Sequence, residues 1–236
     1  MSDHSANRHP REHAVAIRYQ QQSAEIKALQ RQCYALATLR LQAAVDAAGG
    51  QGQGLAIMSD IDETILDNSA VMAHAMTLDE RHDNIETWKL WEREGDPHLI
   101  PGAADFLALA DRLGVTIFYV SDRFDENKMA TIATLSRLGL PQVDADHVLL
   151  FGPPKSVRRA AIESDYRIIL QLGDTLHDFD GGFATDDLQH QHRLTEDHAH
   201  RFGVDWIVFP NAVHGKWMDA EIMPWKAPLA GSSGRT

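Results

Sequence analysis

The feature that most constrains the fold is a short apolar run followed at once by acidic residues, in the stretch LAIMSDIDETILDNS (55–69). The run over 55–58 has the length of a buried strand rather than of a helix. Residues two apart in a strand face the same side, so Asp60 and Asp62 are predicted to point toward one spot at its carboxyl end. Open α/β sheets bind their ligands at that end of the strands. The stretch therefore predicts a strand with a ligand site at its tip.

Two neighbouring carboxylates repel each other, and a divalent cation is the usual compensation. Hard oxygen ligands suit magnesium in particular. A carboxylate held beside a phosphate is also a plausible nucleophile, and a second one can donate a proton to the leaving oxygen. The competing interpretation is an ordinary turn, where aspartates are common. The later strands are needed to decide between the two.

Strands and helices are predicted to alternate along the rest of the chain. One long helix, or two joined ones, is expected over 13–48, because apolar residues recur at helical spacing and no Gly or Pro precedes Gly49. Further buried strands are expected at 115–123, 148–151, 167–172 and 205–209, with helices between them. This alternation predicts an α/β fold with a mostly parallel sheet and helices on both faces.

The predicted organisation is one α/β core with helical additions. The core is expected over 54–222, with a helical insert at about 69–101, and the insert and the 13–48 helix are expected to form a small lobe. Within the insert, Trp88 and Trp91 lie three apart, either as core residues or as a wall that stacks on a substrate ring. The polar ends, 1–12 and 227–236, are expected to be disordered.

Charge and hydropathy restrict the partners. A net charge of −12 argues against binding to a nucleic-acid polymer, which needs clustered Lys and Arg. A small phosphorylated substrate stays compatible, because a bound cation can invert the field inside a cleft. The chain has no apolar run of about 18 residues, so no membrane partner is expected, and without an apolar export signal a cytoplasmic location is expected. A homodimer is left open.

Four predicted strands end in groups that can act on a phosphate. These groups are Asp60 and Asp62, then Ser121, then Lys155 just past the third strand, then Asp174 and Asp178. The carboxyl ends of parallel strands share one edge of the sheet, so the groups can converge. Together they would supply a nucleophile, an acid, a hydrogen-bond donor, a cation and a metal ligand, which suits phosphoryl transfer.

This pattern resembles the four motifs of the haloacid dehalogenase (HAD) superfamily, here DIDET, Ser121, Lys155 and the GDxxxD run from Gly173 to Asp178. Within the superfamily the chain is similar to the class C acid phosphatases, a bacterial group typified by lipoprotein acid phosphatase and 5′-nucleotidase. The stretches that carry this similarity are DIDETILDNS, TWKLW, FYVSDR and FPNAVHGKW. The resemblance implies a three-layer Rossmann-like (HAD-like) fold and a magnesium-dependent acid phosphatase. Its substrates would be small phosphomonoesters, with 5′-nucleotides as candidates, and its intermediate an aspartyl-phosphate.

The resemblance also implies a role for each catalytic residue. Asp60 would attack phosphorus, and Asp62 would protonate the leaving alkoxide and then deprotonate the attacking water. Ser121 would hydrogen-bond the phosphoryl oxygens, and Lys155 would neutralise charge between nucleophile and phosphate. Phosphotransfer to an alcohol, or phosphate binding without catalysis, are the alternatives on the same fold.

The metal and substrate residues follow from the same resemblance. Mg²⁺ would be bound by the carboxylates of Asp60 and Asp174 and by the backbone carbonyl of Asp62. Asp178 would orient the groups around the metal or Lys155, and Thr64 would support the ligands without binding the metal itself. Substrate contacts are expected from Arg123, Trp88 and His214, with a surface ion pair as the alternative for Arg123.

Three positions depart from the family pattern. Asp122 and Thr175 each stand where the family carries Asn, and His214 stands where it carries a Tyr that clamps a nucleoside base. Relatives also carry an export signal, usually with a lipid-modified Cys. Of the remaining candidates, the histidines at 190, 192, 198 and 200 fit no zinc spacing and are expected on a solvated helix. The single cysteine, Cys33, is expected to be a core thiol.

Overall fold

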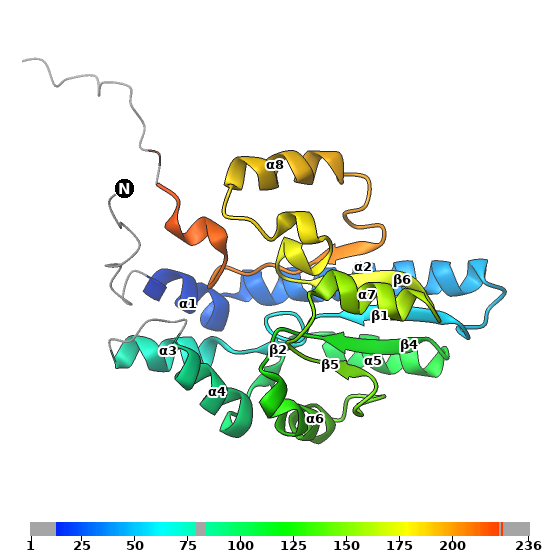
Figure 1. The fold of residues 1–236 in the computed structure, drawn as a ribbon, viewed down its shortest axis with the longest axis horizontal. Coiled ribbons are helices and arrows are strands. Elements are labelled where there is room, and N and C mark those ends of the chain that lie inside the picture. Colours follow the sequence, from blue (N-terminus) through cyan, green and yellow to red (C-terminus); the bar gives the residue numbers. More distant parts are fainter. Residues whose placement is uncertain (1–12, 79–83, 222, 224–236) are drawn as a thin grey trace, which may run out of the picture.

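A computed structural model describes residues 13–78, 84–221 and 223 (Figure 1). The two ends predicted to be disordered, 1–12 and 227–236, lie outside the described residues. In the described part, a five-stranded sheet has the order β5-β4-β1-β6-β7, and every neighbouring pair is parallel. Its strands are β1 (Leu55–Ser59), β4 (Thr116–Val120), β5 (Val148–Leu149), β6 (Arg167–Gly173) and β7 (Trp206–Val208).

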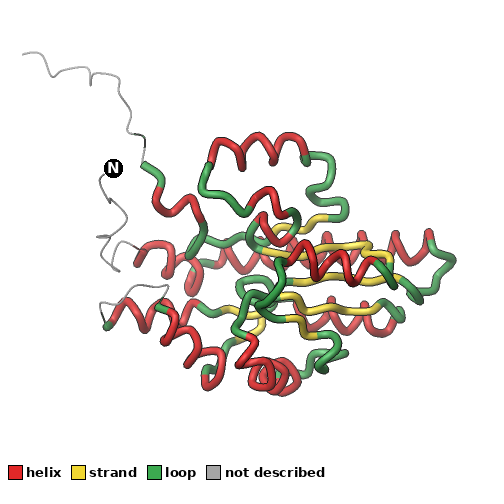
Figure 2. The backbone as a smooth tube through the Cα atoms, viewed as in Figure 1, coloured by secondary structure: helices red, strands yellow, loops and turns green. Residues whose placement is uncertain are grey.

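The central strand β1 is buried at all five positions, because sheet neighbours and helices cover both its faces. Leu55 and Ile57 face one apolar cluster, while Ala56 and Met58 face another on the opposite side. The first cluster is covered by α2 (Ala24–Ala47), α5 (Ala103–Arg112) and α6 (Lys128–Arg137). The second is covered by α7 (Lys155–Glu163), and α8 (Leu188–Asp197) packs near the β7 edge. The predicted α/β architecture with helices on both faces is confirmed (Figure 2).

The long amino-terminal helix is split in two, as α1 (Ala14–Gln22) and α2, which meet at Ser23. The Ser23 hydroxyl accepts a hydrogen bond from the Glu25 amide at 3.1 Å, which caps the start of α2. Along α2 the buried residues recur every three or four positions and face the sheet: Ile26, Gln30, Tyr34, Ala37, Leu41 and Val45. At the site end of the sheet, the Tyr34 hydroxyl donates to the Thr64 carbonyl at 2.7 Å.

Three helices gather beside the carboxyl ends of the strands: α1, α3 (Ser69–Thr77) and α4 (Ile85–Glu94) (Figure 1). They share a small apolar cluster that includes Ile17, Val71 and the half-buried Trp88 and Trp91. The insert that carries α3 and α4 is joined to the core through a two-stranded antiparallel ribbon, β2 (Leu66–Asp67) before α3 and β3 (His98–Leu99) after α4. These strands are too short to leave a periodic signal in the sequence.

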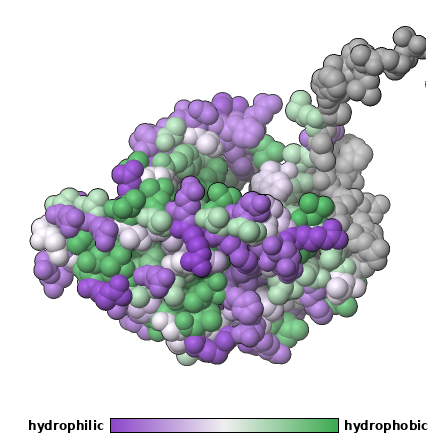
Figure 3. Space-filling view, turned by 180° about the vertical axis from the view of Figure 1, so that it is seen from behind, coloured by the Kyte–Doolittle hydropathy of each residue, from purple (hydrophilic) through white to green (hydrophobic). Residues whose placement is uncertain are grey.

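The surface seen from behind mixes hydrophilic and hydrophobic residues (Figure 3). No helix in the described ranges is long and apolar enough to span a membrane.

Candidate active site

The two carboxylates after β1 lie at the carboxyl edge of the sheet but have different partners. The strand ends at Ser59, and the next amide, that of Asp60, still donates to Leu172 of β6 at 2.9 Å. From there the chain turns, with Glu63 in the left-handed region at φ 53°. Asp60 and Asp62 both line one cavity of about 320 Å³, where Asp60 pairs with Lys155 and Asp62 pairs with Arg123. Since β1 ends at Ser59, both aspartates lie in the loop after the strand and not in the strand itself.

Lys155 joins the strand ends by ion pairs to two buried carboxylates. It is the first residue of α7, and its Nζ lies 2.5 Å from Asp60 Oδ1 and 2.6 Å from Asp178 Oδ1. Burial opposes the charge on Lys155, but the two aspartates outweigh burial and raise the pKa of its ammonium group. Lys155 therefore stays charged beside the proposed nucleophile.

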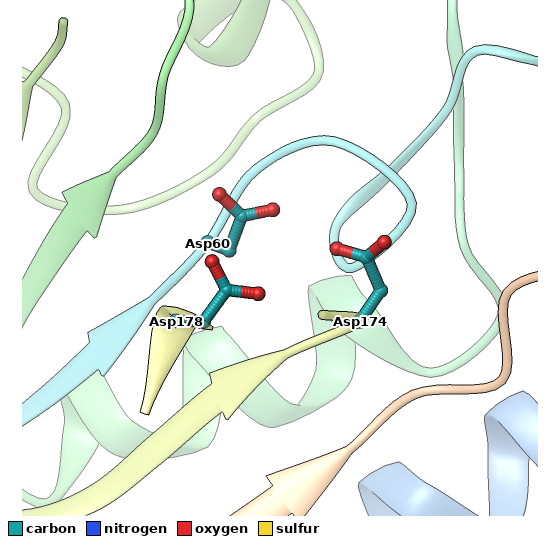
Figure 4. A group of neighbouring side chains, drawn as sticks. All are labelled: Asp60, Asp174 and Asp178. Atoms are coloured by element: carbon teal, nitrogen blue, oxygen red, sulfur yellow. The ribbon is translucent and has the colours of Figure 1, made fainter. Parts of the chain in front are cut away.

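Three aspartates form a cluster that could hold a cation: Asp60 after β1, and Asp174 and Asp178 after β6 (Figure 4). One oxygen of each lies within 4.8 Å of the others. Asp178 already accepts through both oxygens, from Lys155 and from the amide and hydroxyl of Thr175. Asp60 and Asp174 are thus the carboxylates with most capacity left for a metal, and an all-oxygen set suits a hard divalent cation.

The charges on these two aspartates are unfavourable without a cation. Burial raises the pKa of Asp60 well above its usual range, even with Lys155 opposing the shift. Burial likewise raises the pKa of Asp174 to about 7, although the nearby His214 opposes it. Thr64 lies 3.5 Å from Asp174 through its hydroxyl, and Asn211 donates to Asp174 at 2.6 Å. A divalent ion at this place would relieve the repulsion between the carboxylates.

This arrangement predicts how stability depends on pH and metal. Asp60 and Asp174 have folded pKa values above their unfolded ones, so the stability they contribute is lost as pH rises, up to about 7 for Asp174. The metal-free protein is expected to be more stable at about pH 5 than at about pH 8, and Mg²⁺ is expected to raise the melting temperature more at the higher pH. Thermal unfolding in MgCl₂ and in EDTA at both values checks this.

Asp174→Asn is the control for that measurement, because it removes one proposed metal ligand and should reduce the Mg²⁺ effect. Carboxylates with lowered pKa values, such as Asp62 and Asp178, change protonation below this pH window and do not reverse the sign. An equal Mg²⁺ effect at both pH values would contradict the assignment.

Asp62 is held by donors on three sides. The Arg123 guanidinium binds it through Nε at 2.9 Å and Nη2 at 2.7 Å, Asn68 Nδ2 donates at 2.8 Å, and Ser121 Oγ donates at 3.1 Å. Burial would raise the pKa of Asp62, but Arg123 and the other donors outweigh it and lower the pKa. Arg123 is only 3% exposed, so its ion pair with Asp62 is buried. The surface ion pair that the sequence left open for Arg123 is therefore not what the structure has.

His214 lines the cavity beside Asp174. Its Nε2 lies 3.1 Å from Glu63 Oε2 and 3.7 Å from Asp174 Oδ2, and Asn211 contacts its ring. Burial opposes the imidazolium, but the bond to Glu63 and the charge of Asp174 raise the pKa of His214 to about 9. The imidazole that stands in place of the family's Tyr is therefore held as a cation at neutral pH by these two carboxylates.

Asp122, the other departure near the phosphate site, forms an ion pair with Arg158 at 2.6 Å. Arg158 follows Lys155 by three residues on α7 and also donates to the Ser121 carbonyl at 2.7 Å. One helix face thus supplies the cation of the site and fastens the end of β4. Thr175, the remaining departure, caps the turn that carries Asp178.

Several residues at the site were not predicted from the sequence. Glu63 and Asn68 lie inside DIDETILDNS and Asn211 inside FPNAVHGKW, but no role was predicted for them, and Arg158 belongs to no motif. Arg158 reaches the site because α7 packs against the ends of β4 and β5. Conversely, the histidines of α8 form no metal cluster within the described residues, and His198 packs against Trp206. The Cys33 thiol donates to the Val208 carbonyl at 3.3 Å, and burial raises its pKa to about 11.

A parallel sheet whose central strand ends in DIDET, with a lysine and two aspartates on the neighbouring ends, defines a phosphatase of the HAD fold. Residues 4–217 match the family described as HAD superfamily, subfamily IIIB (Acid phosphatase). The chain belongs to this family, which makes it a phosphomonoesterase.

Solved structures agree with this assignment. The class C acid phosphatase from Bacillus anthracis is 33% identical, with a TM-score of 0.81 over 88% of this chain and 87% of that chain. A second structure of that enzyme, with tungstate bound, gives the same values. The resemblance to class C acid phosphatases predicted from the motifs is confirmed.

Proposed function

We propose that the protein is a magnesium-dependent phosphomonoesterase in which Asp60 forms an aspartyl-phosphate. The observation that carries the proposal is the contact between Lys155 Nζ and Asp60 Oδ1 at 2.5 Å, on the wall of the cavity that Asp62 also lines. A buried cation beside a carboxylate provides a place where a phosphoryl group can be held while that carboxylate attacks.

The reaction would proceed in two displacements at phosphorus. First, a carboxylate oxygen of Asp60 bonds to phosphorus, the ester P–O bond breaks, and protonated Asp62 gives its proton to the leaving oxygen. Second, Asp62, now a carboxylate, takes a proton from water as the water oxygen bonds to phosphorus. The aspartyl P–O bond breaks, which releases inorganic phosphate and restores Asp60. Ser121 and Lys155 would stabilise the charge on the phosphoryl oxygens in both steps.

Mg²⁺ would be held by Asp60 and Asp174, with the Asp62 backbone carbonyl as a further oxygen ligand. When bound, the ion would neutralise phosphoryl charge and hold the phosphate in line for attack. Asn211 and Thr64 would keep Asp174 oriented, since both hydrogen-bond its carboxylate.

The cavity supports a substrate with an organic group of moderate size. Trp88 and Ile85 of α4, together with Phe124 and His214, line it around the carboxylates. A volume of about 320 Å³ is at the lower end for small-molecule sites, and aromatic walls suit a flat ring. We propose 5′-nucleotides among its substrates, with Trp88 and His214 beside the base and Arg123 beside the phosphate end.

An acid-leaning pH optimum follows from the same roles. Asp62 must be protonated to act as a donor, yet Arg123 lowers its pKa, so the active form becomes rarer as pH rises. If Mg²⁺ bound beside Asp60 keeps this nucleophile ionised, the rate with poor leaving groups should therefore increase toward acid pH.

The test of the proposed function is an assay with p-nitrophenyl phosphate and with AMP, with and without EDTA. We expect turnover of both, loss of most activity in EDTA and recovery with added MgCl₂. Product analysis with an added alcohol separates hydrolysis from phosphotransfer. Phosphate binding without turnover of any monoester, with Mg²⁺ present, would overturn the proposal.

A further inference from the structure

We infer that helix α4 of the insert positions the proton donor Asp62 through Trp91 and Asn68, so that both are positioning residues for leaving-group protonation. This inference rests on the role proposed above for Asp62. It concerns a second tryptophan of α4, since Trp88 lines the cavity while Trp91 does not. The evidence is a chain of hydrogen bonds from the helix to the carboxylate.

The first link fixes the orientation of the Asn68 amide. Trp91 Nε1 donates to Asn68 Oδ1 at 2.8 Å, and Asn68 Nδ2 donates to Asp62 Oδ1 at 2.8 Å. An indole nitrogen is only a donor, so it requires the amide oxygen on its own side. The amide nitrogen is thereby turned toward Asp62, where a flipped amide would place two oxygens against each other. Arg123 adds a weaker bond to the same amide oxygen at 3.3 Å.

The position of Asn68 in the chain shows that its side chain is not used locally. Asn68 precedes α3 as its N-cap residue, where Asn commonly accepts a hydrogen bond from a backbone amide of the first turn. Here the side chain makes no such capping bond and reaches to Asp62 and Trp91 instead. Asn68 is fully buried, so its amide is held in place by these contacts rather than by water.

A second link from the same helix reaches the other side of Asp62. Glu92, next to Trp91, accepts hydrogen bonds from the Phe124 amide at 3.1 Å and from Asn127 Nδ2 at 2.9 Å. These bonds fasten the segment that follows Arg123, the other main donor to Asp62. Helix α4 therefore supports both Asn68 and Arg123, which bind the Asp62 carboxylate.

Proton transfer to the leaving oxygen depends on where the acid points, whereas attack by Asp60 does not use Asp62. An alkyl phosphate needs the proton because an alkoxide is a poor leaving group, while p-nitrophenolate leaves without one. Loosening Asp62 should therefore lower kcat/KM selectively for alkyl esters, because kcat/KM covers the reaction up to release of the leaving group and not the later hydrolysis of the aspartyl-phosphate, in which Asp62 acts on both substrates. A change that only damages the fold would slow both kinds of substrate.

The experiment compares glycerol phosphate with p-nitrophenyl phosphate in Trp91→Phe, which keeps an aromatic ring and removes the indole N–H. We expect kcat/KM for glycerol phosphate to fall roughly tenfold, with kcat/KM for p-nitrophenyl phosphate retained. Asn68→Ala provides the second variant and should show the same selectivity more strongly. Thermal unfolding of each variant is measured first, to check that the variant is folded.

Trp206→Phe is the matched control, because the Trp206 indole nitrogen is buried, has no hydrogen-bond partner among the described residues, and lies in β7. It should change stability without changing the ratio between the two substrates. Asp62→Asn separates the two levels of the argument. Selective loss of glycerol phosphate hydrolysis in Asp62→Asn but in neither Trp91→Phe nor Asn68→Ala overturns this inference alone. An unselective effect of Asp62→Asn on kcat/KM overturns the proposed role of Asp62 as the proton donor.

Discussion

Replacing Asp60 by Asn is expected to reduce turnover of p-nitrophenyl phosphate by at least about a thousandfold, the order seen when a nucleophile is removed. The amide is nearly the same shape as the carboxylate, so Lys155 keeps an oxygen to which it can donate, in place of the 2.5 Å contact. An amide oxygen carries no full negative charge and is a poor nucleophile toward phosphorus. The loss should appear in kcat at saturating Mg²⁺.

Asp67→Asn is the matched control, with the same chemical change seven residues further along the chain. Asp67 lies in β2 and accepts from the Ser69 amide at 2.9 Å, a bond that an amide oxygen can also accept. This variant is expected to retain wild-type turnover. Comparable turnover by Asp60→Asn and the wild type would eliminate the aspartyl-phosphate mechanism.

Replacing Lys155 by Met is expected to damage both catalysis and stability. The ammonium group lies between Asp60 and Asp178, whose side chains are 8% and 4% exposed, so its removal leaves these two buried carboxylates without the cation that bridges them. Breaking such a pair typically costs about 3 kcal/mol of unfolding free energy. Loss of a charge that stabilises the transition state should lower kcat by about a hundredfold.

The pH dependence distinguishes this explanation from a simple packing defect. Without Lys155 the already raised folded pKa of Asp60 rises further, and Asp178 loses the main interaction that lowers its pKa, so stability is lost as pH rises through the folded values. The deficit relative to wild type should therefore be larger at about pH 8 than at about pH 5 in urea unfolding. Lys128→Met is the control, because Lys128 also begins a helix but its Nζ binds the Ala145 carbonyl in an exposed position. A deficit independent of pH would contradict the electrostatic account.

The succession of strands along the chain and the acidic residues after β1 follow from local patterns in the sequence. The apolar run before Asp60 and the alternation of strands and helices are enough to bring Asp60, Lys155 and Asp174 to one edge of a parallel sheet. The start of α7 at Lys155 follows from the Gly and Pro residues directly before it.

What could not be predicted depends on contacts between distant parts of the chain. The side-chain direction of Asp62 is set by Arg123, Ser121 and Asn68, which lie on different elements. The left-handed backbone of Glu63 changes the direction of the chain within the motif itself, and no residue type there signals it. Pairing of Asp122 with Arg158 likewise exists only because α7 packs across β4 and β5.

The contact between Tyr34 and the Thr64 carbonyl bears on the smallest fragment that can work as an enzyme. A chain trimmed to start at β1 would keep every proposed catalytic group. It would lose α2, whose Leu41 and Val45 lie in the core, and with it the Tyr34 hydroxyl that donates to the Thr64 carbonyl in the DIDET loop. Such a fragment would expose to water the part of its sheet that α2 covers. The minimal catalytic unit therefore includes α2, and attempts to shorten this enzyme should begin elsewhere.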